Sequence, residues 1–247
     1  MNDRLIILSD IHGNLTALES VIKDFESRDY RPDSIAILGD IINYGMRPNE
    51  VIERLKRLSG KYDISVNLFG NHEKALIDGD TSHFSTERGK KILDFTRNCL
   101  SNETLDYIKG LSKEGLTEKM IGGKKVLFVH GNITDPFWGK LTPDSTDNMQ
   151  YSQYDYVISG HSHIPLLFEK FYPVENPEYR NKKRTVFLNP GSVGQPRNHN
   201  PKAQYLYIEI RTEIFHFNSV KYDIEAERTL YSDEVDGFYS DRLIKGI

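Results

Sequence analysis

Cysteine is nearly absent from this chain of 247 residues, since Cys99 is the only one. A single thiol excludes an internal disulfide and a zinc site built from several thiolates, and it fits a reducing compartment. Any bound metal must then be held by nitrogen and oxygen atoms. Cys99 itself is expected to be a small buried hydrophobe on a helix.

Long hydrophobic runs are also missing. No apolar stretch approaches the ~20 residues of a membrane-spanning helix, and the first four residues lead directly into an apolar strand, with no room for a signal peptide. With 38% hydrophobic and 28% charged residues, the composition is that of a soluble globular protein. We expect one domain over residues 1–247, located in the cytoplasm.

An excess of positive charge is lacking as well. The formal net charge is −4, and no stretch forms a basic arm or an RNA-binding signature. These features disfavour polymeric nucleic acid as a partner. The one short basic run, Lys182-Lys183-Arg184, is expected at a solvated hairpin tip ahead of a strand. The sequence indicates no particular oligomeric state.

Strands and helices alternate in the first seventy residues. Apolar runs at 5–8, 34–38 and 64–69 predict three strands, and apolar positions at helical spacing in 15–25 and 51–58 predict the helices between them. Such units give parallel strands with right-handed crossovers. The following segment, about 74–115, is helical and polar, and is expected to form a small cap or insertion.

The later part of the chain is rich in strands. They are expected at 116–121, 124–129, 156–159, 166–172, 185–188, 204–210 and 213–217. Gly122-Gly123 is a good two-residue hairpin turn between the first two. Parallel units first and hairpins later predict an α/β fold with two mixed sheets packed face to face and helices outside.

Five short polar segments each follow an apolar run directly. They are Asp10-Ile11-His12, Gly39-Asp40, Gly70-Asn71-His72-Glu73, His130-Gly131 and Gly160-His161-Ser162-His163. A buried strand delivers side chains at its carboxyl end, so these residues are expected to converge on one rim of a sheet. Any one segment alone would more often be a turn or a helix cap, but five together indicate a metal site.

Seven candidate ligands are too many for one ion. Asp10 and His12 can hold one cation from the loop after the first strand, and Asp40 is the natural bridge, because its two oxygens can each face a different metal. The remaining candidates are Asn71, His130, His161 and His163. Such a set suits two divalent ions about 3.5–4 Å apart, which can clamp a displacement at phosphorus. Oxygen and nitrogen ligands favour manganese, iron, zinc or nickel over calcium or magnesium alone.

The charge of such a centre favours an anionic substrate. Two divalent cations exceed the charge of Asp10, Asp40 and one hydroxide, so the site is net positive and suits phosphate. A water bridging the metals would have a lowered pKa and could attack phosphorus directly. His72, next to Asn71, is expected to act as the general acid for the leaving oxygen. The sequence therefore predicts hydrolysis of a phosphate ester.

These motifs resemble those of the calcineurin-like metallophosphoesterase superfamily. The resemblance implies a four-layer α/β/β/α sandwich, and His72 matches the family's catalytic histidine. It also implies one metal held by residues like Asp10, His12, Asp40 and His163, and a second held by residues like Asp40, Asn71, His130 and His161. Segments 45–51, 135–138 and 189–197 resemble a bacterial branch of small predicted phosphodiesterases related to diadenosine tetraphosphatases.

The sequence departs from the protein Ser/Thr phosphatases at residues 43 and 44. Those enzymes have a pattern like Gly-Asp-x-Val-Asp-Arg-Gly, whereas Asn43-Tyr44 stand in place of the Asp-Arg pair. The difference weakens an assignment as a phosphoprotein phosphatase or as a symmetric dinucleotide tetraphosphatase. Glu73, where many small phosphodiesterases have aspartate, is interpreted as neutral.

Several residues are candidates for contacting the substrate. Arg197 ends a glycine-rich loop and could bind a phosphate through its forked guanidinium or pair with a surface carboxylate, and Asn71 is a second candidate. Trp138 could stack on a base or anchor a long loop, and Tyr44 and Arg47 are weaker candidates. Three histidines lack a partner motif and are expected to be ordinary: His83, His199 and His216.

Our leading hypothesis from the sequence is a dinuclear metal-dependent phosphodiesterase acting on a small phosphorylated molecule. One alternative is a phosphomonoesterase, including nucleotide or protein phosphatase activity. Another is a catalytically silent scaffold that binds proteins. A silent member would be expected to lack ligands or the general acid, and all of them are present here.

Overall fold

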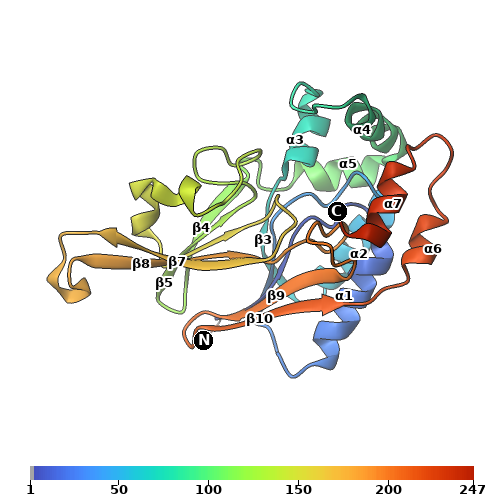
Figure 1. Cartoon of the computed structure of the whole chain (residues 1–247). Helices are drawn as coiled ribbons and strands as arrows, with labels where there is room; N and C mark the ends of the chain where they lie inside the picture. The colour runs from blue at the N-terminus through green and yellow to red at the C-terminus, as the bar shows by residue number, and fades with distance from the viewer. Residues whose placement is uncertain (1–2) are drawn as a thin grey trace.

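The computed structural model describes residues 3–247 and contains two five-stranded sheets (Figure 1). Met1 and Asn2, which begin the short segment ahead of the first strand, lie outside the described residues. The first sheet has the order β10-β9-β1-β2-β3, with bounds Ile214–Val220, Ala203–Glu209, Arg4–Leu8, Ser34–Ile37 and Asp63–Asn67. The second has the order β4-β5-β6-β8-β7, with bounds Leu116–Ile121, Lys124–Val129, Tyr156–Ser159, Lys182–Asn189 and Leu166–Pro173.

Both sheets are mixed. In the first, β1, β2 and β3 are parallel, while β9 is antiparallel to β1 and β10 is antiparallel to β9. In the second, β5, β6 and β8 are parallel, and β4 and β7 form antiparallel edges. Within each sheet the parallel strands therefore place their carboxyl ends, and the loops that follow, toward one edge.

Helices cover the first sheet and continue around the rim. Helices α1 (Leu15–Ser27) and α2 (Pro48–Ser59) pack on the sheet, and α3 (Asn71–Asp78), α4 (Glu87–Cys99) and α5 (Asn102–Lys109) lie above them in Figure 1. The short α6 (Ile224–Arg228) and α7 (Phe238–Lys245) return beside them at the C-terminal end. No helix among the described residues is long and apolar enough to cross a membrane.

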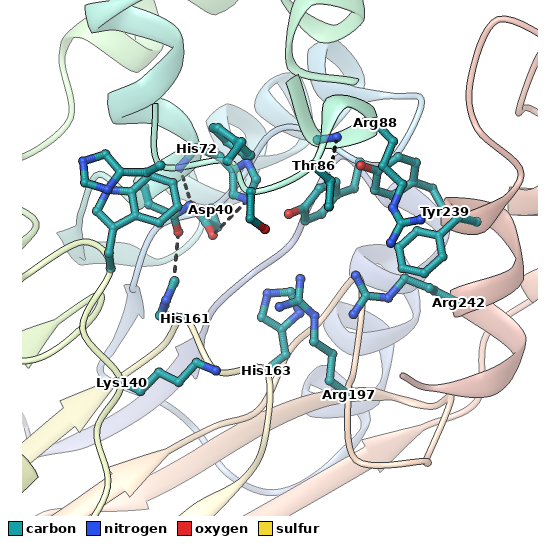
Figure 2. A pocket seen from close by; sticks show the side chains of 18 residues that line it. Asp40, His72, Thr86, Arg88, Lys140, His161, His163, Arg197, Tyr239 and Arg242 are labelled. Carbon is teal, nitrogen blue, oxygen red and sulfur yellow. Dashed lines mark hydrogen bonds and ion pairs between the residues drawn. The ribbon is translucent and has the colours of Figure 1, made fainter. Parts of the chain in front are cut away.

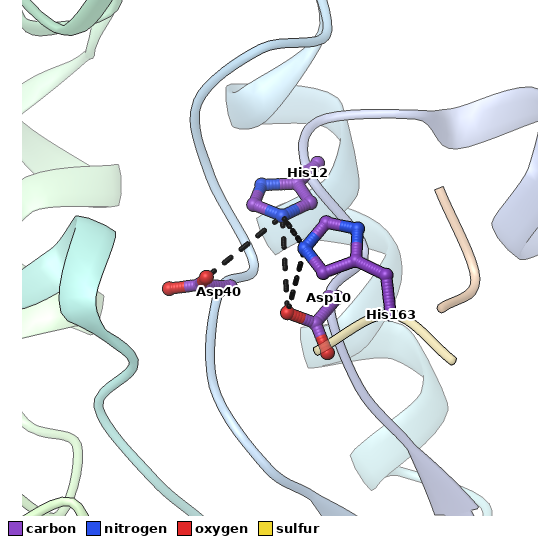
Figure 3. Close-up of side chains that lie close together, drawn as sticks. All are labelled: Asp10, His12, Asp40 and His163. Carbon is purple, nitrogen blue, oxygen red and sulfur yellow. Dashed lines mark hydrogen bonds and ion pairs between the residues drawn. The ribbon is translucent and has the colours of Figure 1, made fainter. Parts of the chain in front are cut away.

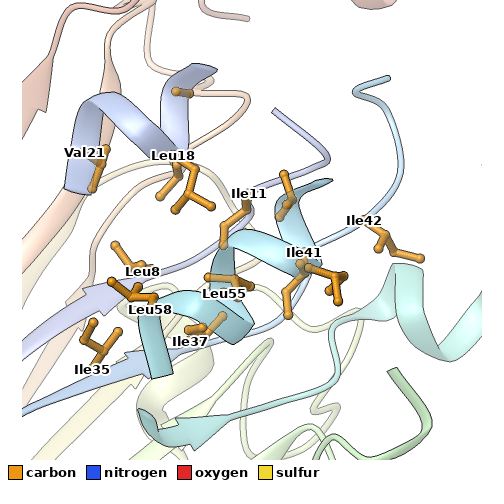
Figure 4. Packing of buried hydrophobic residues seen from close by; sticks show 14 of the residues in the cluster. Leu8, Ile11, Leu18, Val21, Ile35, Ile37, Ile41, Ile42, Leu55 and Leu58 are labelled. Atoms are coloured by element: carbon orange, nitrogen blue, oxygen red, sulfur yellow. The ribbon is translucent and has the colours of Figure 1, made fainter. Parts of the chain in front are cut away.

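The core follows the two-residue alternation of β1. Ile6 and Leu8 face the helices, whereas Leu5 and Ile7 face the second sheet. Figure 4 shows the helix side, where residues of β1 and β2 pack against α1 and α2. Both faces of the first sheet are thus buried, which explains the continuous apolar run of β1.

The outer face of the second sheet has a separate cover. Val157 and Phe187 pack there against Leu141, Tyr151 and other residues of segment 141–154. That segment contains two 3-10 turns, Asp144–Asp147 and Met149–Gln153. The predicted α/β architecture of two mixed sheets flanked by helical segments is confirmed.

All ten strands expected from the sequence are present, with ends shifted by up to three residues. Gly122 and Gly123 both have positive φ, 58° and 82°, as the predicted hairpin turn requires. Two details of the prediction from the sequence are wrong. Cys99 is exposed at the last position of α4, beyond the buried face of that helix. Lys182-Lys183-Arg184 belong to β8, because the hairpin of β7 and β8 extends further than their apolar residues indicate.

Candidate active site

The predicted ligands follow parallel strands that end at the same rim. Asp10 and His12 follow β1, Asp40 follows β2, and Asn71 begins α3 after β3. From the second sheet, His130 follows β5, and the His161 and His163 pair follows β6. The structure brings all seven side chains together in two groups that share Asp40.

The first group contains Asp10, His12, Asp40 and His163 (Figure 3). One atom from each of these four buried residues lies within 4.8 Å of the others. The Nε2 atoms of His12 and His163 are 3.1 Å apart, and Oδ1 of Asp10 lies 3.1 Å from Nε2 of His163.

The facing Nε2 atoms of His12 and His163 carry no hydrogen, so no hydrogen bond joins them. Nδ1 of His12 lies 3.1 Å from the main-chain oxygen of Ile42, and Nδ1 of His163 lies beside that of Gln195. A carbonyl oxygen only accepts, so each Nδ1 carries the hydrogen and each Nε2 presents a lone pair. Burial lowers the pKa of both imidazoles and keeps them neutral.

The Asp10 carboxylate lies beside these two imidazoles. Its Oδ2 accepts hydrogen bonds from Ser9 Oγ at 2.6 Å and from the His161 N–H at 3.1 Å. Its Oδ1 is buried and has no hydrogen-bond donor. Two imidazole lone pairs and one carboxylate oxygen therefore point at one another. They would repel unless a cation lay between them, so the residues present fit a metal ion.

The second group contains Asp40, His130 and His161, with Asn71 beside them. Nδ1 of His130 donates to the main-chain oxygen of Leu38 at 2.7 Å. Its Nε2 therefore faces Oδ2 of Asp40 at 3.4 Å and Oδ1 of Asn71 at 3.0 Å. Nδ1 of His161 also lies 3.0 Å from Oδ1 of Asn71. This group therefore offers a second set of nitrogen and oxygen atoms that could bind a metal ion.

Asp40 connects the two groups through a single oxygen. Its Oδ1 accepts the main-chain N–H of His72 at 3.0 Å, which orients the carboxylate. Its Oδ2 faces His12 at 3.8 Å and His130 at 3.4 Å. That its two oxygens face different metals stays a prediction, because Oδ1 accepts only one hydrogen bond and keeps a second lone pair.

Five of the seven candidate ligands have left-handed backbone conformations. Asp10, His12, Asp40, His161 and His163 have φ between 50° and 64°. Residues with a Cβ rarely adopt this region, and it costs of order 1–3 kcal/mol at each position. Such strain concentrated in one cluster indicates that function rather than stability determines the backbone here.

The loops are held together by the carboxylate of Glu73. It is fully buried and accepts main-chain N–H groups of Asp40, Ile41 and Gly70 at 2.8 Å and of Ile42 at 3.1 Å. These bonds fix the Asp40 loop to the start of α3. Glu73 therefore has a structural role in addition to any bearing on the class of substrate, and the sequence did not indicate that role. Only the tertiary structure reveals its role, because the four donors come from a different loop or from the cap of its own helix.

Glycines allow these two loops to approach so closely. A Cβ on Gly70 would lie 2.1 Å from Oδ1 of Asp40, and Gly39 has a φ of 93°. Any larger residue at position 70 would displace the Asp40 carboxylate.

His72 lies at the edge of the Asp40 group and lines a cavity. Its Nδ1 lies 2.6 Å from Nδ2 of Asn43, whose Oδ1 accepts from Thr96 Oγ1 at 3.0 Å. The threonine hydroxyl fixes the amide so that Nδ2 donates to His72. The proton of neutral His72 is then on Nε2, 3.8 Å from Oδ2 of Asp40. Burial lowers the pKa of His72 to about 4.

The cavity beside the two groups has a volume of about 380 Å³ (Figure 2). Its wall includes His72 and both substrate-binding candidates, Asn71 and Arg197. Tyr44 also lines it, with its ring centroid 4.5 Å from that of His72. Arg47 does not line it, because its guanidinium pairs with the buried Glu227 instead.

Aromatic side chains form the opposite wall. Trp138 lines the cavity and stacks on His83, with ring centroids 4.8 Å apart and planes at 15°. His83 is an exposed loop residue, as expected, but it lines the cavity, whereas His199 and His216 lie away from it. Nothing in the spacing of the sequence links His83 to Trp138, because they are far apart along the chain.

Sequence reasoning also missed Arg88, Tyr239 and Arg242, which line the same cavity from α4 and α7. Tyr239 stacks on Tyr44, with ring centroids 5.1 Å apart. These residues lie on amphipathic helices without a motif. Only the packing of α7 beside the rim identifies them.

Comparisons with known proteins agree with this geometry. The sequence profile of the calcineurin-like phosphoesterase superfamily domain matches residues 4–213. An uncharacterized protein of Methanocaldococcus jannaschii, MJ0912, is 31% identical, with 98% of each chain covered. Phosphodiesterase YfcE of Escherichia coli K12 is 25% identical, over 81% of this chain and 84% of that protein.

Two solved structures are similar over almost the whole chain. A metallophosphoesterase from Sphaerobacter thermophilus has a TM-score of 0.75 and 28% identity, with 99% of each chain covered. The hypothetical protein PH1004 from Pyrococcus horikoshii OT3 has a TM-score of 0.77 and 24% identity, covering 99% of this chain and 98% of that one.

Proposed function

Since this chain belongs to the calcineurin-like phosphoesterase superfamily of metal-dependent hydrolases, we propose that it is a dinuclear phosphodiesterase acting on a small phosphorylated molecule. The observation that carries the proposal is the facing pair of Nε2 lone pairs on His12 and His163, beside the unpartnered Oδ1 of Asp10. A protein interior retains such an arrangement when a cation balances it.

In this proposal one divalent ion is held by Asp10, His12, Asp40 and His163. The second is held by Asp40, Asn71, His130 and His161. Mixed nitrogen and oxygen donors suit manganese, iron, zinc or nickel. Bound ions of this kind supply positive charge for phosphate oxygens and make water more acidic.

His72 donates a proton to the leaving oxygen. Protonated His72 carries a hydrogen on both ring nitrogens, so the Asn43 amide turns its Oδ1 toward Nδ1 when the ring is charged, and Nε2 is the atom that gives its proton to the leaving oxygen. A bound phosphate places negative charge beside this imidazole and raises its pKa from the value of about 4 in the free protein. Proton donation is therefore coupled to binding of the substrate.

Arg197 and Asn71 contact the phosphate oxygens. The Arg197 guanidinium lines the cavity, and its Nε is buried without an acceptor. Its Nη2 donates to Gln195 Oε1 at 3.1 Å, which holds the side chain in place. A phosphate oxygen would supply the missing acceptor for Nε.

The preference for a diester rests on Asn43-Tyr44 and on the cavity. Tyr44 occupies the place where protein phosphatases have an arginine, and it is pinned between His72 and Tyr239. A cavity of about 380 Å³ lies within the usual range for small-molecule sites. YfcE, which is similar to this chain, is named a phosphodiesterase, and that name supports the same choice.

The test uses metal-stripped protein reloaded with manganese. Bis(p-nitrophenyl) phosphate and p-nitrophenyl phosphate release the same chromophore, so their kcat/KM values compare diester with monoester directly. We expect the diester to be hydrolysed faster and the metal-stripped protein to be inactive. A reaction confined to the monoester would replace the proposal with a phosphomonoesterase. Absence of both reactions despite two bound metals would favour the scaffold alternative.

A further inference from the structure

Three arginines from three separate elements line one side of the cavity. Arg88 belongs to α4, Arg197 to the loop after β8, and Arg242 to α7. Figure 2 shows the three side chains together on the side of the cavity away from His161. Arg242 and the residues of α7 lie beyond residues 4–213, the part matched by the family profile.

None of these guanidinium groups is paired with an acidic side chain. Among residues 3–247, no Asp or Glu oxygen lies within 4.0 Å of the charged nitrogens of Arg88, Arg197 or Arg242, although most other arginines of the described chain have such a partner. Nε of Arg242 donates to the main-chain oxygen of Ile247, which leaves its two terminal nitrogens unassigned.

The three positive charges lie close enough to repel one another. The guanidinium carbons of Arg88 and Arg242 lie 3.9 Å and 4.9 Å from the centroid of the same ring, Phe238. Burial and the charge of Arg197 lower the pKa of Arg242 to about 10. Such an arrangement is unfavourable in the free protein and becomes favourable when an anion binds.

The arginines form a path that leads away from the candidate metal centre. Arg197 lies between this centre and α7, because its main-chain N–H donates to the His163 oxygen at 3.2 Å and its guanidinium carbon lies 5.9 Å from the ring centroid of Tyr44, which stacks on Tyr239 of α7. Arg88 acts in turn on Arg242. A substrate whose scissile phosphate contacts Arg197 would therefore reach Arg242 and Arg88 with its next anionic group.

We propose that Arg88 and Arg242 form a subsite for a second phosphate group of the substrate, separate from the phosphate that is hydrolysed. The forked guanidinium matches phosphate oxygens in a bidentate manner, and both arginines line the same cavity beside Phe238. This inference rests on the proposed function, and it defines the substrate as a phosphodiester with an additional phosphate.

Two esters test the subsite. The first is the p-nitrophenyl ester of thymidine 5′-phosphate, and the second is the same ester with a 3′-phosphate. With manganese-loaded protein, we expect kcat/KM to be about tenfold higher for the ester with the 3′-phosphate, as one charge-assisted pair provides. The ratio should fall toward one in Arg242→Gln and in Arg88→Gln. Lys91→Gln removes an exposed charge from α4 outside this cavity and should preserve the ratio.

Equal kcat/KM values for the two esters in the wild-type protein would overturn the inference, as would a ratio that persists in both arginine variants. Calorimetry separates this outcome from failure of the proposed function. Thymidine 3′,5′-bisphosphate should bind manganese-loaded protein about tenfold more tightly than thymidine 5′-phosphate, with the difference lost in Arg242→Gln. If neither ester is hydrolysed, the proposed function fails, and these affinities decide the subsite: equal affinities overturn it.

Discussion

The Glu73 carboxylate accepts a hydrogen bond from the main-chain N–H of Asp40, with Oε2 of Glu73 2.8 Å from the Asp40 nitrogen. The same carboxylate accepts three further main-chain N–H groups, so the position of Asp40 depends on it. In Glu73→Gln, an amide NH₂ would face some of these donors and leave them without an acceptor. We expect the free energy of unfolding to fall by about 3 kcal/mol.

Denaturant unfolding of the metal-free protein measures this change. Glu103→Gln is the matched control, since Glu103 is an exposed residue in the first turn of α5. Its substitution should change stability by less than about 0.5 kcal/mol. Equal stability of the two variants would contradict the role assigned to Glu73.

His72→Ala and Asp40→Asn should separate proton donation from metal binding. His72→Ala removes the proton donor while leaving both ligand groups intact, so we expect two metals per chain and a kcat lower by about 10²–10⁴-fold. Asp40→Asn weakens both groups, because Oδ2 of Asp40 faces His12 and His130. It should lose metal and activity together.

Metal analysis after dialysis, combined with diester kinetics, distinguishes the two variants. His216→Ala changes an exposed histidine on β10 and serves as the control for both. Full activity in either His72→Ala or Asp40→Asn would refute the assigned roles.

Metal binding should release a proton at neutral pH. Burial opposes the charged form of His130, but the Asp40 carboxylate outweighs it and raises the pKa of His130 to about 9 in the metal-free protein. A metal ligand must be deprotonated, so this proton has to leave. The apparent metal affinity should increase about tenfold per pH unit up to about pH 9 and then level off.

The raised pKa has the opposite effect on the metal-free fold. Protonated His130 contributes stability that is fully present below its ordinary pKa of 6.5 and is lost as the pH rises through about 9.

Calorimetry of metal binding at pH 7, in buffers of different ionisation enthalpy, counts the protons that the protein releases. A count of zero would show that His130 is already neutral.

Asn43→Asp should shift the pH dependence of turnover. A carboxylate cannot donate to Nδ1 of His72, so this nitrogen would have to carry the hydrogen, and the charged imidazolium would be favoured. The pKa of His72 should rise. Since the proton donor is lost as the pH rises through its pKa, the basic limb of the kcat profile should move up by about one unit.

A pH profile of diester hydrolysis measures this shift. Asn98→Asp adds the same charge at an exposed position of α4 and should leave the profile unchanged. An identical profile for Asn43→Asp and the wild-type protein would show that His72 does not set the basic limb.

The sequence predicts the ten strands and the gathering of the seven ligands, because both depend on local patterns. An apolar run ends, a polar residue follows, and parallel strands place their carboxyl ends together. The role of Glu73 could not be predicted in this way, since it depends on hydrogen bonds from main-chain N–H groups of the Asp40 loop. Arg88 and Arg242 lie on helices of ordinary amphipathic pattern, and only the three-dimensional packing brings them together.

The left-handed backbone at five of the candidate ligands lowers the stability of the fold. These residues are Asp10, His12, Asp40, His161 and His163. Each of these positions would relax if glycine replaced the ligand, because glycine adopts this region without strain. A lineage that stopped using the site could therefore gain stability by discarding its ligands. The five side chains at strained positions therefore indicate that this fold gives up stability to hold the ligand cluster together.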